Sequence, residues 1–207
     1  KLIVIDTATD VIKGYTMSTP GDLSTISIVA ADVESVSCAS ADPKDLCFGN
    51  SGTKMYYCDS VDHRVYEYTL STAYDVSTAT YVQYGNQRLD YGSATYSSAP
   101  HGIDILEDGT AFYVMGISGA DKVTKVPMTT PFDSNTITTT GRNVANAAVT
   151  FGIGLQITPD SREESLLFFD PVYVYQVALS SGKNTTNMFG APYNYKYQTN
   201  VRVDYGS

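Results

Sequence analysis

The chain has 207 residues, a formal net charge of −9 and a pI near 4.5, with 13 basic side chains against 22 acidic ones. This charge argues against a nucleic-acid backbone or an anionic membrane as a partner, because both require clustered Lys and Arg. No apolar run approaches the ~20 residues of a membrane-spanning helix, and the 17 Tyr and 16 Gly favour β structure. A chain of this length forms about one domain or one repeat array.

The first predicted elements are a strand at 1–6 and the segment YTMSTPGDLSTISI at 15–28. This segment returns as YTLSTAYDVSTATY at 68–81, with seven of its 14 positions identical. At the same offset of 53, Lys1 aligns with Lys54. The chain therefore repeats a unit of about 50 residues, and such a period indicates a repeat architecture.

The second unit shows the predicted strands most clearly, and they are DLCFG (45–49), KMYYCD (54–59), RVYEYTL (64–70) and ATYVQY (79–84). Turn residues separate these strands. Glu67 lies between Tyr66 and Tyr68 in a period of two, which predicts a half-buried strand. The turns NSGT and EDGT are expected to use Gly at a positive φ.

Two further units follow. The segment 100–116 repeats 43–59 at an offset of 57, 126–136 repeats 68–78 at an offset of 58, and a more divergent copy covers 154–181. Four short antiparallel strands in each unit are typical of a β-propeller blade. The sequence shows no amphipathic helix, so we expect an all-β fold.

The segment CDSVDHRVYEY (58–68), together with the DGT turns, resembles the repeats of NHL and YVTN-type propellers. The likeness covers nearly the whole chain in diverged form. The added LSTxxDxST extension resembles repeats in proteins of bacteria and tailed phages. The resemblance implies the fold and hardly restricts the function.

The C-terminal segment 200–207 is predicted to supply the innermost strand of the first blade. Placed before Lys1, it gives VRVDYGS-KLIVID, which parallels 46–59 with one residue missing. We therefore expect four blades in a closed ring, formed by 200–207 plus 1–36, 43–85, 100–142 and 151–190. The alternative is part of a larger propeller or a ring completed by another subunit, since a chain that starts at Lys1 is either processed or one part of a longer protein.

The two histidines, His63 and His101, are expected on one face, because loops between the second and third strands and loops between blades share a face of a propeller. With Asp59, Asp62 and Arg64 nearby, they could form a metal site or a small acid–base site. The alternative is that His63 and Arg64 occupy turn positions and His101 only starts a strand.

Acidic residues recur at fixed places in the units. Asp6, Asp59 and Asp170 end the second strand, where a ring of carboxylates could bind calcium. We favour the alternative that each of them caps its own turn. Apart from calcium, no cofactor is expected.

Two further sets of residues are interpreted as structural. They are the turn-forming Asp22, Asp75 and Asp133 and the buried Cys38, Cys47 and Cys58, whose spacing fits no zinc site.

The longest irregular insertion, 83–98, carries Tyr84, Arg88, Tyr91 and Tyr96. Exposed tyrosines stack and form hydrogen bonds, which suits protein or glycan recognition. The favoured function is therefore a non-catalytic binding or structural module, extracellular or on a cell or virion surface, and able to join a larger particle or filament. The alternative is a propeller enzyme of the lactonase or lyase type with a metal at the channel mouth.

Overall fold

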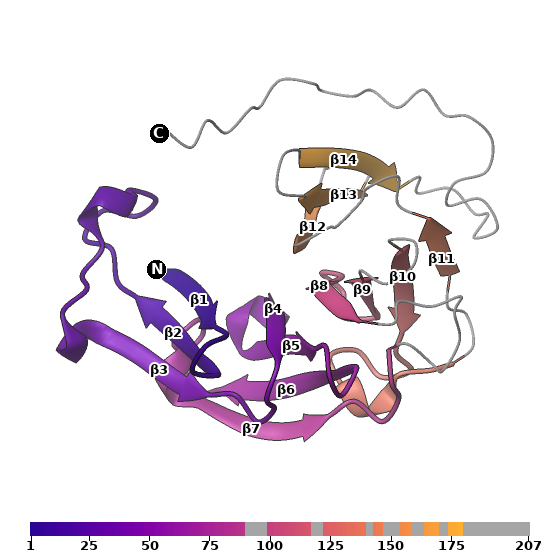
Figure 1. Ribbon diagram of the computed structural model, residues 1–207, viewed down its shortest axis with the longest axis horizontal. Coiled ribbons are helices and arrows are strands. Elements are labelled where there is room, and N and C mark those ends of the chain that lie inside the picture. Colours follow the sequence, from indigo (N-terminus) through magenta and orange to yellow (C-terminus); the bar gives the residue numbers. More distant parts are fainter. Residues whose placement is uncertain are drawn as a thin grey trace.

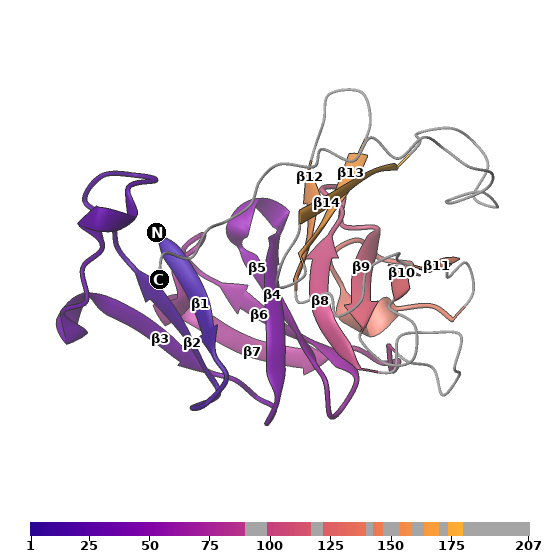
Figure 2. The same cartoon turned by 45° about the horizontal axis from the view of Figure 1, so that its top comes forward.

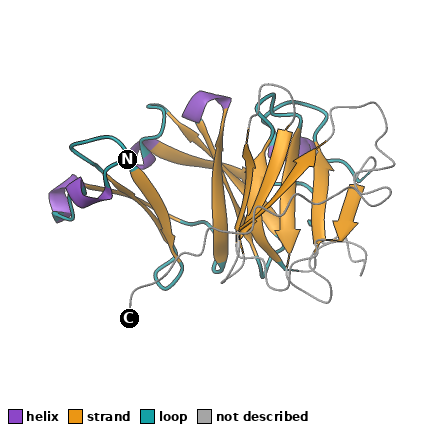
Figure 3. Cartoon of the chain, turned by 90° about the horizontal axis from the view of Figure 1, so that it is seen from above, coloured by secondary structure: helices purple, strands orange, loops and turns teal. Residues whose placement is uncertain are grey.

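The computed structural model describes residues 1–89, 99–116, 122–139, 143–146, 154–158, 164–169 and 174–179. Within them the chain forms four antiparallel sheets and no α-helix, and its only helical elements are five 3-10 turns of three residues. Figure 3 shows the strands side by side with these turns at their ends. The all-β, propeller-like prediction is thereby confirmed, and the number of blades stays a prediction.

The sheets follow one another along the chain. The first contains β1 (Leu2–Asp6), β2 (Val11–Tyr15) and β3 (Val33–Ser37), and the second β4 (Pro43–Gly49), β5 (Lys54–Asp59), β6 (Arg64–Leu70) and β7 (Ala79–Tyr84). The third contains β8 (Pro100–Ile105), β9 (Ala111–Gly116), β10 (Lys122–Pro127) and β11 (Asn143–Asn146), and the fourth β12 (Gly154–Thr158), β13 (Glu164–Phe169) and β14 (Val174–Leu179). The 3-10 turns are η1 (Leu23–Thr25), η2 (Ala30–Asp32), η3 (Asn50–Gly52), η4 (Val76–Thr78) and η5 (Ser134–Thr136).

The four sheets form an open arc, with β4, β8 and β12 on its concave side and β3, β7 and β11 on its convex side (Figure 1). β8 lies between β4 and β12 and contacts both. In the first sheet the innermost described strand is β1, which pairs with β2. The predicted closing strand, 200–207, lies outside the described residues, as does Asp170.

The hairpin turns have the predicted backbone. Gly52 and Gly109 have φ of +83° and +71°, a region that L side chains adopt at a cost. Each glycine also faces an aromatic ring from its own sheet, Tyr74 in one case and Phe132 in the other. Any side chain at Gly52 or Gly109 would clash with that ring.

The expected half-buried pattern of β6 is wrong. Tyr66, Glu67 and Tyr68 are 5%, 1% and 1% exposed, so both faces of the strand are covered. One face of the second sheet contributes Tyr56 and Val65 to the core shared with the third sheet, and the other contributes Tyr66 and Tyr68 to the core shared with the first sheet. Stacked sheets remove the solvent face that a period of two implies.

In the second and third units, the segment between the third and fourth strands acts as a latch on the preceding sheet. We call η1, η4 and η5, each with the Asp before it, the three latches. Asp22, Asp75 and Asp133 accept a hydrogen bond from the backbone N–H two residues further on, which confirms them as turn formers. η4 contacts β2 and β3, and η5 contacts β6 and β7.

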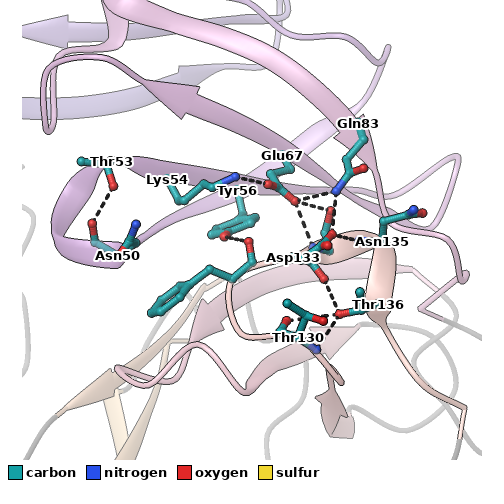
Figure 4. Close-up of polar contacts among 12 residues, drawn as sticks. Asn50, Thr53, Lys54, Tyr56, Glu67, Gln83, Thr130, Asp133, Asn135 and Thr136 are labelled. Carbon is teal, nitrogen blue, oxygen red and sulfur yellow. Dashed lines mark hydrogen bonds and ion pairs between the residues drawn. The ribbon is translucent and has the colours of Figure 1, made fainter.

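Glu67 is the centre of the contact between the η5 latch and the second sheet (Figure 4). Its Oε2 accepts hydrogen bonds from Ser134 N (3.0 Å) and Ser134 Oγ (2.8 Å). It also accepts from Gln83 Nε2 at 3.1 Å and forms an ion pair with Lys54. Burial alone would raise the pKa of Glu67, but the hydrogen bonds from Lys54, Ser134 and Gln83 hold it below its ordinary value. The carboxylate is therefore ionised and joins two sheets.

In the first sheet, a carboxylate equivalent to that of Glu67 comes from the fourth strand and not from the third. Glu34 of β3 pairs in register with Gly14, as Gln83 pairs with Glu67. Lys1 forms an ion pair with Glu34, as Lys54 does with Glu67. A side chain at Gly14 would lie 2.8 Å from Glu34 Oε2. The carboxylate is thus carried by the third strand in the second unit and by the paired residue of the fourth strand in the first unit.

We expect Glu67→Ala to lower the free energy of unfolding by about 2–3 kcal/mol, because Lys54 and Ser134 lose the acceptor they share in a buried site. Glu67→Gln is the matched control, since it keeps one acceptor oxygen and should lose less. Urea denaturation followed by tyrosine fluorescence measures both variants. Because the pKa of Glu67 is lowered in the fold, its contribution is present above pH 4.5 and fades as the pH falls through the folded-state pKa. Equal stability of Glu67→Ala and wild type at pH 7 would contradict the role of the latch.

Candidate functional site

The innermost strands β4 and β8 begin with the same irregularity. The pairing register shifts between Pro43 and Asp45 and again between Pro100 and Gly102. Each bulge leaves one residue out of the pairing, Lys44 in β4 and His101 in β8. Bulges often re-aim a side chain next to a functional site. A lysine and a histidine thus hold equivalent positions at the start of neighbouring inner strands.

Asp42 connects these positions. Its carboxylate forms an ion pair with Lys44 and accepts a hydrogen bond from Ser60 Oγ, and its backbone N–H donates to Asp59 Oδ2 at 2.9 Å. Partial burial would raise the pKa of Asp42, but the contacts with Lys44 and Ser60 and the charge of His101 lower it. Asp42 is therefore an anion that is bonded to Lys44 and Ser60 and interacts electrostatically with His101.

Asp45 joins the inner strands through backbone hydrogen bonds. Its Oδ2 accepts from Ile103 N of β8 at 3.0 Å, and its Oδ1 accepts from Leu46 N at 2.9 Å. Burial raises the pKa of Asp45 to about 6, with a further contribution from nearby Asp104, although the N–H groups of Ile103, Leu46 and Leu155 oppose the rise. A carboxyl group with such a pKa can exchange a proton near neutral pH.

Asp104 of β8 is the second inner acid, and its Oδ1 accepts from Ile105 N at 2.8 Å. When β8 is superimposed on β4 by the pairing of each with its second strand, Asp104 takes the position of Cys47, and Gly102 takes the position of Asp45. A side chain at Gly102 would lie 3.0 Å from Leu155 Cβ, so glycine allows the close approach of β12 to β8. We call Asp42, Lys44, Asp45, His101 and Asp104 the inner-strand site.

Of this site, sequence reasoning had identified only His101. The missed signal is an acid inside an apolar strand, Asp45 in DLCFG and Asp104 in GIDIL. Such a residue is expensive to bury without partners, and it therefore marks either a strong hydrogen-bonding position or a functional one.

Asp59 is fully buried and caps its own turn. Its Oδ1 accepts from Val61 N at 2.8 Å and from Asp62 N at 2.6 Å. Asp6 caps in the same way through Ala8 N at 3.1 Å. The preferred interpretation of these acids as turn caps fits both positions. Within the described part of the chain, no three His, Cys, Asp or Glu side chains are grouped to hold a metal ion, and calcium binding stays a prediction.

The structure brings together most of the other predicted site residues around the β5–β6 turn. His63, with a φ of +56°, places Nδ1 3.0 Å from Arg88 Nη2. Arg64 donates to Gly85 O at 2.6 Å, and its guanidinium lies 4.9 Å from the ring centre of Tyr84. Asp62 accepts a hydrogen bond from the Tyr66 hydroxyl. These contacts fasten the segment after β7 to the turn.

His101 has different surroundings from His63. It starts the innermost strand of the third sheet, with Nδ1 3.1 Å from Ala99 O, and it acts on Asp42 electrostatically. His63 is instead held by the segment that follows the outermost strand of the second sheet. The other two predicted binding residues, Tyr91 and Tyr96, lie outside the described residues.

The three cysteines are free thiols. Cys47 and Cys58 are buried in the core, as expected, and burial raises the pKa of both. Cys38 follows β3, is only partly buried, and has its pKa raised to about 12 by partial burial and by nearby Asp10 and Asp59. Thiols with such raised pKa values are poor nucleophiles at neutral pH.

No protein-family model matches the chain, and no curated protein matches its sequence. Solved structures do match. A Bacteroides fragilis protein provisionally named a 6-phosphogluconolactonase has a TM-score of 0.51 at 15% identity, over 86% of this chain and 49% of that one. The shared feature is the fold.

Two more structures have lower scores. A Bacteroides uniformis protein with the same provisional name has a TM-score of 0.48 at 14% identity, over 84% of this chain and 46% of its own. A luciferin-regenerating enzyme has a TM-score of 0.47 at 19% identity, over 77% of this chain and 50% of its own. The chain thus spans about half the length of the solved structures that it matches.

The fold match corrects the functional expectation from the sequence. The preferred non-catalytic module is contradicted, because the matched Bacteroides fragilis structure is named as an enzyme. The narrower likeness to NHL and phage repeats has no family-model match behind it. As for membranes, the described residues contain no helix of the length and apolarity that a bilayer crossing requires.

We expect Asp45 to make stability depend on pH. Because its pKa is raised from 3.8 to about 6 in the fold, its contribution to stability is fully present below pH 3.8 and is lost as the pH rises through 6. The loss attributable to this group is about 2–3 kcal/mol. Asp45→Asn should remove this pH dependence, whereas Glu107→Gln, at an exposed turn, should retain it.

Free energies of unfolding measured at pH 4 and pH 8 check this prediction. The same difference between the two pH values in Asp45→Asn and in wild type would show that Asp45 is not the titrating group.

Proposed function

We propose that the chain belongs to a propeller hydrolase that opens cyclic esters, with its chemistry at the inner-strand site. The observation that carries this proposal is Asp45, a half-buried residue of an innermost strand whose carboxyl pKa is raised to about 6 by burial. Near neutral pH such a group is mostly ionised but basic enough to take a proton from water. Lys44 precedes Asp45 at the bulge of β4, and His101 holds the equivalent bulge position in β8.

Lactone hydrolysis requires three contributions. A base must activate water, positive charge or hydrogen-bond donors must stabilise the oxyanion, and a proton must reach the leaving alkoxide. We assign the first to Asp45, the second to Lys44 and the third to His101. Asp42 holds Lys44, and the charge of Asp104 helps to keep the pKa of Asp45 high.

The fold match supports the choice of substrate class for testing. The Bacteroides fragilis protein carries a lactonase name, and at 15% identity its likeness extends only to the fold. A metal at the channel mouth, with calcium as the candidate ion, stays part of the proposal to be tested. The NHL-type subfamily, the location outside the cell or on a virion, and protein or glycan partners also remain predictions.

We expect measurable hydrolysis of a δ-lactone, with glucono-δ-lactone and 6-phosphogluconolactone as the first probes. Asp45→Asn should lower kcat by about 10²–10⁴-fold, the usual share of a general base. His101→Ala should lower kcat less if water can replace the proton donor. Acid release measured in a pH-stat follows the reaction, with and without added calcium or a chelator.

Glu107→Gln serves as the control and should match wild-type activity, because Glu107 is exposed on a turn outside the inner-strand site. Wild-type turnover that Asp45→Asn leaves unchanged would refute the assignment of the base. No turnover of any lactone, with or without calcium, would refute the proposed function.

A further inference from the structure

The η1 latch has no sheet to bind among the described residues. Leu23 aligns with Val76 and Ser134, which open the η4 and η5 latches. Val76 and Ser134 are both 0% exposed, because each is inserted against the preceding sheet. Leu23 is 64% exposed. The first unit thus exposes a latch, whereas the two equivalent latches of the chain are buried against a neighbouring sheet.

Two more apolar residues are exposed on the same extension. Ile28 is 81% exposed and Val29 is 61% exposed, on the loop that leads from η1 to η2. Figures 1 and 2 show this extension at the end of the arc near the N-terminus, away from the second sheet. We call Leu23, Ile28 and Val29 the open-end face.

The two completed interfaces define what such a face binds. η4 packs on β2 and β3, and η5 packs on β6 and β7, which are the third and fourth strands of the preceding unit. The polar contacts come from a side chain on the third strand or on its cross-strand partner, Glu67 in one interface. The occupant of the open-end face must therefore present the outer strands of another such sheet.

The opposite end of the arc offers that partner. β14 is the third strand of the fourth sheet, and Gln176 has there the register position that Glu67 has in β6. The two ends of the arc thus carry a latch at one end and the third strand of a sheet at the other, the two elements that the completed interfaces bring together.

We infer that the open-end face docks on the β14 end of a second copy of this chain, head to tail and twice, so that two arcs complete one ring. The first and fourth sheets lie at opposite ends of an open arc (Figure 1). The Bacteroides fragilis protein, matched over 49% of its length, uses about twice this much chain for the same fold. Head-to-tail contacts form rings when their rotation closes.

The test is the mass of the 207-residue chain in solution, measured by sedimentation velocity over a range of concentrations. Wild type should sediment as a dimer of the 22.4 kDa chain. Leu23→Asp should raise the dissociation constant about 100-fold, because each dimer loses two sites at about tenfold each. Val61→Asp is the matched control, since Val61 is 65% exposed but lies on the β5–β6 turn, and it should remain dimeric.

Hydrogen exchange on the same samples gives an independent measurement. The Leu23–Thr25 amides should be protected in wild type at high concentration and exposed on dilution or in Leu23→Asp. A monomer at all concentrations would overturn the inference. Protection that is independent of concentration would also overturn it, because the chain's own last sheet would then cover the face. Circular dichroism should show that Leu23→Asp is folded, since Leu23 is exposed within one chain.

Discussion

The rest of the structure depends on the buried carboxylate of Glu67. A charge that is 1% exposed is tolerable only when its oxygens are fully engaged, and here Lys54, Ser134 and Gln83 engage them. Two of these partners come from the same sheet and one from the next. The requirement to satisfy one charge therefore fixes how the second and third sheets stack, and with them the starts of β4 and β8 that form the inner-strand site.

The first interface shows that the repeat preserves the place of a charge and not the residue that carries it. Gly14 stands where Glu67 stands one unit later, and Glu34 brings its carboxylate to the space that Gly14 leaves open. A sequence alignment of the two units shows no acid at the position of Gly14. In the structure, a lysine–glutamate ion pair is nevertheless present in both units.

The candidate site was predicted in part. The sequence placed Asp59, His63 and Arg64 in one turn, and the structure agrees because their contacts lie within a hairpin and the segment after it. The reactive character of Asp45 was not predictable in this way. Its partner Ile103 is 58 residues away, and its raised pKa comes from burial between strands of separate sheets. No local pattern reports that burial.

The sequence by itself determined the features that short stretches control, namely the strands, the period of about 50 residues, the glycine turns at Gly52 and Gly109, and the capping role of Asp22, Asp75 and Asp133. Those features depend on neighbours a few residues apart. Only the tertiary structure decided that β6 is buried on both faces, that the extensions are latches, and that Asp45 links the inner strands. Each of these outcomes depends on the stacking of one sheet on another, which brings together residues from different units.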